Sequence, residues 1–131
     1  MGENRVVVEL FFEKPSFEEV SKIAKSLEEA GVKSMMLPPE ERHINTHLIV
    51  ELADMEKARA KIKEMGVPVK EKEVMLIKMD NKPGAMADTI MRISGKGINL
   101  TYAFSVTVSP TTSYLLLNSA DNEQALKLLE S

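Results

Sequence analysis

The sequence contains no cysteine and no long apolar run, and its positive and negative charges nearly balance. The lack of cysteine excludes disulfides, thiolate catalysis and cysteine-ligated zinc sites. The first apolar run breaks at Glu9, which makes it too short for a signal peptide or a membrane span. The net charge is −3, with Lys and Arg scattered along the chain, which argues against nucleic-acid binding through a basic face. We therefore expect a cytoplasmic protein without membrane or nucleic-acid partners.

Signatures of catalysis are also missing. The sequence has no phosphate-binding loop of the GxxxxGK type and no GxSxG elbow. Asp80 and Asp88 flank a Pro-Gly turn, but Asp88 is more simply a first-turn carboxylate that complements a helix dipole. We therefore expect a protein that is not an enzyme and that carries no cofactor or metal, with a small ferredoxin-like enzyme as the least favoured alternative.

The residues that are present predict alternating strands and helices around a packed core, since 44% of them are hydrophobic and 28% are charged. In the first half, the β-branched run 6–12 predicts a buried strand. Ser16 and Glu19 match a capping box before a helix that ends at Gly31. Strands over 32–37 and 46–52, a helix over 54–66 and a short strand at 67–69 complete the series.

The second half repeats this order. Lys14 and Lys82 are 68 residues apart, Gly31 and Gly97 are 66 apart, and Asp54 and Asp121 are 67 apart. Three landmarks in nearly constant register indicate an internal duplication. We expect one repeat over residues 1–72 and another over 73–131.

One repeat reads strand, helix, strand, strand, helix, strand, which is the ferredoxin-like pattern. The predicted fold class is α+β, with two βαββαβ repeats that share an antiparallel sheet and carry their helices on one face. The second repeat ends before its last strand. Either the strand is missing, or another chain or the linker completes the edge, and an open edge favours a homodimer or larger assembly.

The motif Asn81-Lys82-Pro83-Gly84-Ala85-Met86-Ala87, followed by Gly97-Ile98-Asn99-Leu100, resembles the ACT domain. The tandem arrangement is similar to small stand-alone proteins with two ACT domains, a family thought to sense amino acids. The first repeat departs from the pattern, because Ser16 follows Pro15 where glycine is expected and Lys33 stands where the second repeat has Asn99. The resemblance implies an amino-acid-binding regulatory protein. The main alternative is a regulatory subunit that docks on a metabolic enzyme without binding a ligand itself.

Residue chemistry agrees with a ligand site in the second repeat. Pro83 suits the first position of a helix, so the amides of Gly84, Ala85 and Met86 would face a carboxylate at the helix N-terminus. Asn81 and Asn99 would converge there and hold the polar end of the ligand. We expect Gly84→Ala to weaken binding with little change in melting temperature. The alternative is that Pro-Gly serves only the turn and that Asn99 only supports a neighbouring loop.

Two further groups are weaker candidates. Tyr102 and Phe104 share one side of a strand and belong to the core or a subunit interface, with the wall of the ligand pocket as the alternative. His43 and His47 could bind a metal with help from Glu40 or Glu41, but we favour solvated loop histidines.

Overall fold

The structure is a computed structural model, and it describes residues 4–13, 15–36 and 46–130. The chain divides into two compact units. The described residues of Val7–Lys72 form the N-terminal unit, and those of Met1–Val6 and Glu73–Ser131 form the C-terminal unit.

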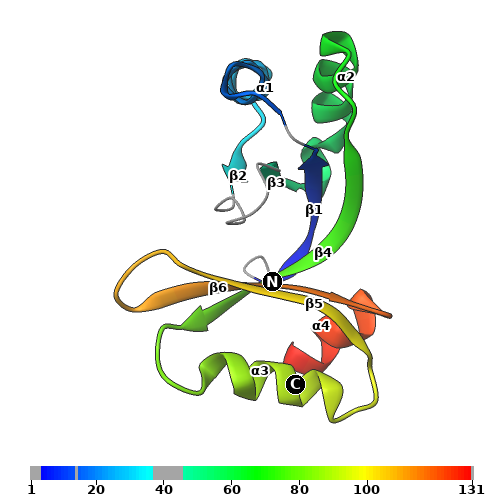
Figure 1. Cartoon of the computed structure of the whole chain (residues 1–131). Coiled ribbons are helices and arrows are strands. Elements are labelled where there is room, and N and C mark those ends of the chain that lie inside the picture. The colour runs from blue at the N-terminus through cyan, green and yellow to red at the C-terminus, as the bar shows by residue number, and fades with distance from the viewer. Residues whose placement is uncertain (1–3, 14, 37–45, 131) are drawn as a thin grey trace. The chain divides into compact units, whose positions relative to one another are not determined.

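The N-terminal unit is built around a small antiparallel sheet (Figure 1). Its elements are β1 (Arg5–Phe12, whose first two residues belong to the C-terminal unit), α1 (Phe17–Glu29), β2 (Ser34–Met36), β3 (Thr46–Glu51), a 3₁₀ turn (Leu52–Asp54) and α2 (Met55–Met65). The strand order is β2-β3-β1. Alternate strand residues point at the helices, and with them they form one apolar core: Val8, Leu10, Phe12, Ile23, Leu27, Val32, Leu48, Val50, Met55, Ala58 and Ile62.

The C-terminal unit has the same plan. Its elements are β4 (Lys70–Asp80, whose first three residues belong to the N-terminal unit), α3 (Ala85–Ser94), β5 (Leu100–Thr107), β6 (Thr112–Ser119) and α4 (Asn122–Glu130). The strand order is β4-β6-β5, again antiparallel. Its buried core joins one face of the strands to both helices: Met75, Ile77, Met79, Ile93, Leu115, Leu117 and Ala125.

The predicted fold class is confirmed. The described residues form four α-helices and a six-stranded antiparallel sheet. In each unit both helices contribute to a single core with alternate strand residues, so both lie on the same face of the strands. None of the helices in the described ranges is long and apolar enough to cross a membrane. The cytoplasmic location stays a prediction.

Two details differ from the expectation. Residues 67–69 form no strand, and one continuous strand, β4, runs from Lys70 through the expected repeat boundary at 72/73. The residues Lys70-Glu71-Lys72-Glu73 include no Gly, Pro or Asn that would turn the chain, so β4 extends back through them to Lys70. The N-terminal segment also meets β4 within the C-terminal unit, because the Lys78 N–H donates to Asn4 Oδ1 at 2.9 Å.

Candidate functional site

The predicted ligand loop joins β4 to α3. β4 ends at Asp80, and the helix begins at Ala85 with Gly84 as its N-cap. Gly84 adopts φ +89°, in the left-handed region. The interpretation of Pro83 as the first helical residue is therefore wrong: the glycine turns the chain one residue later, and Pro83 lies in the turn before it.

Three backbone amides at this helix start have no acceptor among the residues that the structure describes. The Ala85 N–H, one of the three expected donors, instead donates to the Lys82 carbonyl at 3.3 Å. Over the described ranges no hydrogen-bond acceptor is found for the N–H groups of Gly84, Met86 and Ala87. The last of these was not among the expected donors. Such amides, at the positive end of a helix dipole, can hold an anionic group.

The Asn81 side chain is occupied within the protein. Its Nδ2 donates to the Pro110 carbonyl at 3.3 Å, and its Oδ1 accepts from the Ser113 hydroxyl at 3.2 Å. The Asn81 N–H adds a bond to the Thr111 carbonyl at 2.9 Å. Asn81 therefore ties the loop to the turn between β5 and β6, and both functional groups of its amide already have partners.

Asn99 does not converge on the loop within one chain. Asp80 pairs with Thr112 at one end of β6, whereas Leu100 pairs with Ser119 at the other end. Seven residues of extended strand separate these two ends by about 23 Å. Asn99 lies exposed beyond the C-terminal end of α3, where its carbonyl accepts from the Ala120 N–H. Sequence order alone does not reveal this separation, because a helix between two parallel strands carries the chain back to the opposite end of the sheet.

Tyr102 and Phe104 share a face of β5, as their spacing predicts, and both are half-buried. The intervening residue Ala103 pairs with Leu117, which belongs to the helix-facing core. The two aromatic rings therefore lie on the face of the strands opposite α3 and α4.

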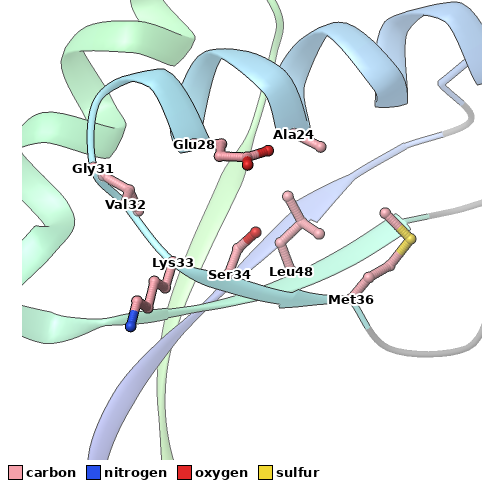
Figure 2. A pocket seen from close by; sticks show the side chains of 8 residues that line it. All are labelled: Ala24, Glu28, Gly31, Val32, Lys33, Ser34, Met36 and Leu48. Carbon is pink, nitrogen blue, oxygen red and sulfur yellow. The ribbon is translucent and has the colours of Figure 1, made fainter.

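The N-terminal unit contains a groove that was not predicted from the sequence. It has a volume of about 680 Å³ and runs between the C-terminal half of α1 and the strands β2 and β3. Figure 2 shows the Glu28 carboxylate and the Leu48 side chain turned toward the same space, while the Lys33 ammonium points away from it. Little in the sequence predicts this groove. Among its lining residues, Met36 alone is a large hydrophobic side chain that is exposed.

His47 is placed differently from the expectation. It lies in β3 with only 13% of its side chain exposed, and its Nδ1 is 3.1 Å from Glu9 Oε1. The prediction of a solvated loop histidine is therefore wrong for His47. The other members of the weighed metal site, His43, Glu40 and Glu41, fall outside the described residues. Among the residues that are described, no group of three or more His, Asp or Glu side chains is placed to hold a metal ion.

Comparison with known proteins gives the family. The model of the ACT domain pair matches residues 9–129. No curated protein matches the sequence.

Solved structures agree in fold. A protein of Bacteroides thetaiotaomicron is 17% identical with a TM-score of 0.71, over 98% of this chain and 88% of that one. The regulatory subunit of aspartate kinase from Thermus thermophilus, in ligand-free form, is 12% identical with a TM-score of 0.64, over 98% and 91%. The aspartate kinase of Clostridium acetobutylicum is 17% identical with a TM-score of 0.70, over 96% of this chain and 32% of that one. The chain belongs to the ACT domain pair family.

Proposed function

We propose that this chain is a non-catalytic regulatory module that binds a free amino acid. The observation that carries the proposal is the ACT domain pair over residues 9–129. The resemblance to a chain described as the regulatory subunit of aspartate kinase supports it, because that chain is similar over nearly the whole length of both. Since one fold serves many functions, the binding site itself has to be argued from residues.

The proposed site is the β4–α3 loop. The ligand carboxylate would accept from the N–H groups of Gly84, Met86 and Ala87, which lack acceptors among the described residues. Pro83 and Ala85 shape the backbone on either side of Gly84, and Asn81 holds the loop in place. The missing Cβ of Gly84 leaves open space beside the backbone.

Asn99 and Tyr102 enter this proposal only through a second chain. They lie toward the opposite end of α3 from the loop. A two-fold axis perpendicular to α3 reverses the direction of this helix in the partner, so it can bring the far end of α3 in one chain beside the loop of the other. A subunit interface of this kind would let Asn99 and Tyr102 cover an amino acid bound to the partner's loop.

Docking on a metabolic enzyme is the second candidate function. It is favoured by the similarity to a separate chain described as a regulatory subunit, of which 91% is covered. In this alternative the chain has no ligand of its own.

A thermal-shift screen of the twenty common amino acids tests the proposal, because a ligand that binds only the native state raises the melting temperature. The decisive variant is Ala87→Glu. Ala87 is exposed at the third helical position, where a Glu carboxylate can reach back to the Gly84 N–H and repel a ligand carboxylate. We expect affinity to fall by about tenfold or more, with no loss of stability, since an acidic first turn suits the helix dipole.

The matched control is Ala87→Met, which adds a side chain of similar length without a charge. It is expected to retain more affinity than Ala87→Glu. If Ala87→Glu binds every effective amino acid as tightly as the parent, the loop is not the site. If no amino acid shifts the parent's melting temperature, the docking subunit becomes the better proposal.

A further inference from the structure

The start of α1 in the first repeat corresponds to the start of α3 in the second. Pro15 and Pro83 are 68 residues apart, so the two strand-to-helix loops align residue by residue. The second loop has three N–H groups without an acceptor among the described residues, and their counterparts in the first loop belong to Ser16, Glu18 and Glu19. What each loop offers to a carboxylate therefore depends on the side chains at these matching positions.

In the first repeat the protein supplies its own carboxylate. Glu19 Oε1 accepts from the Ser16 N–H at 3.1 Å, and Ser16 Oγ accepts from the Glu19 N–H at 3.1 Å. Two of the three corresponding N–H groups are thus already bonded within the helix start. The second repeat has Gly84 and Ala87 at these two positions, and neither has a polar side chain that could do the same. A ligand carboxylate at α1 would have to displace the Glu19 carboxylate and would be repelled by its charge.

The space beside Glu19 is large enough for a small ligand. A cavity of about 320 Å³ is formed there by residues of the N-terminal unit: Phe12, Glu13, Pro15, Glu19, Val67 and Pro68. Its volume lies at the small end of the range for ligand pockets. Two of these lining residues are acidic and none is basic, so the charge of the loop, and not a lack of room, disfavours a carboxylate.

We infer that Glu19 determines which repeat binds the ligand, because its carboxylate occupies in the first repeat the position that a ligand carboxylate takes in the second. This inference rests on the proposed function. Each chain then binds one amino acid, at the β4–α3 loop, and the first repeat is kept empty by its own side chain. The same carboxylate completes the capping box of α1, whereas the N-cap of α3, Gly84, makes no side-chain hydrogen bond.

The test gives the first loop the glycine and the alanine of the second. Ser16→Gly combined with Glu19→Ala removes both bonds of the capping box, and because glycine at an N-cap costs little stability, the variant should fold. The twenty common amino acids are screened by thermal shift on the parent and on this double variant, and those that shift the midpoint are titrated by calorimetry. We expect the number of amino acids bound per chain to rise from one to two. In the Ala87→Glu background, which blocks the second loop, the double change is expected to restore binding.

Two controls separate the carboxylate from the cap. Ser16→Gly alone removes the hydroxyl but keeps the Glu19 carboxylate. Glu18→Ala is the same change as Glu19→Ala at an exposed neighbour, whose carboxylate pairs with Lys22 at 3.1 Å. Both controls should bind one amino acid per chain, as the parent does.

The outcomes distinguish this inference from the proposed function. A parent that binds two amino acids per chain, a double variant that still binds only one, or a control that binds two overturns the inference and leaves the β4–α3 loop as the site. A parent that binds none, together with a double variant that binds one, refutes the β4–α3 loop and supports the role of Glu19. If neither protein binds any amino acid, both proposals are overturned.

Discussion

At Gly84 the backbone requires a residue without a Cβ. Its φ of +89° is a conformation that L-residues rarely adopt, although a Cβ added there would meet no atom within 4 Å. The strain alone should make Gly84→Ala less stable than the parent by about 1–2 kcal/mol, and Gly84→Asn should lose less, because Asn tolerates this region better. The free energy of unfolding in urea measures both. Gly84→Ala is therefore a poor probe of ligand binding, contrary to our expectation from the sequence, and an alanine variant as stable as the parent would contradict the conformation of this loop.

Asn81 offers a second residue-scale prediction. Asn81→Ala removes the hydrogen bonds to the Pro110 carbonyl and the Ser113 hydroxyl, so the free energy of unfolding should fall by about 1–2 kcal/mol. Asn99→Ala is the matched control. Asn99 is exposed and its side chain has no partner among the described residues, so stability should change by less than about 0.5 kcal/mol. Equal losses in the two variants would argue against the structural role of Asn81.

The start of α1 depends on a capping box that the sequence predicts and the structure confirms. Ser16 Oγ accepts from the Glu19 N–H at 3.1 Å, and Glu19 Oε1 accepts from the Ser16 N–H at 3.1 Å. Ser16→Ala should lower the free energy of unfolding by about 1 kcal/mol. Ser21→Ala makes the same change inside the helix, where alanine is the better helix former, so it should be neutral or slightly stabilising. Urea unfolding of both variants measures the difference. If Ser16→Ala is as stable as Ser21→Ala, the cap contributes nothing to the free energy of unfolding.

Local signals explain how well the elements could be predicted. Short stretches of sequence determine the helix periodicity, the capping box and the end of α2, where Gly66 has φ +70°. The extension of β4 back to Lys70 was not predicted, because a charged stretch such as Lys70-Glu71-Lys72-Glu73 is typical of a linker as well as of an exposed strand. The helix predicted over 54–66 begins where expected, since Asp54 is the N-cap of α2, although the Asp54 side chain makes no cap hydrogen bond.

The candidate sites were harder to predict than the fold because they depend on strand register. Glu9 and His47 are 38 residues apart, and they meet only because β1 and β3 pair Phe11 with His47. In the same way, the position of Asn99 relative to the loop follows from the direction of β5, which no local motif encodes. Motif spacing identified the loop itself, but neither the occupied amide of Asn81 nor the distance to Asn99.

At the scale of the whole molecule, the prediction concerns the association of two copies of the chain. We expected a homodimer because the second repeat ends before its last predicted strand. This reason is weaker now, because the N-terminal segment meets β4 where Asn4 binds Lys78. A different feature now supports a dimer. β2 is the last strand in the order β2-β3-β1, has three residues and borders the groove of about 680 Å³, where Met36 is 50% exposed.

A second copy that docks on β2 would bury Met36 and use an edge that is otherwise a liability. A stable interface of standard size removes about 800 Å² from each partner, so one charge at its centre should be disruptive. We therefore predict that the parent sediments at twice the chain mass of 14.6 kDa at micromolar concentration, and that Met36→Lys shifts it toward the monomer. Leu52→Lys places the same charge on a residue that is 49% exposed in the 3₁₀ turn, outside both β2 and α3, and it should leave the mass unchanged. A parent that sediments as a monomer at high micromolar concentration would rule out the dimer, whereas a dimer that Met36→Lys leaves intact would place the interface on another surface.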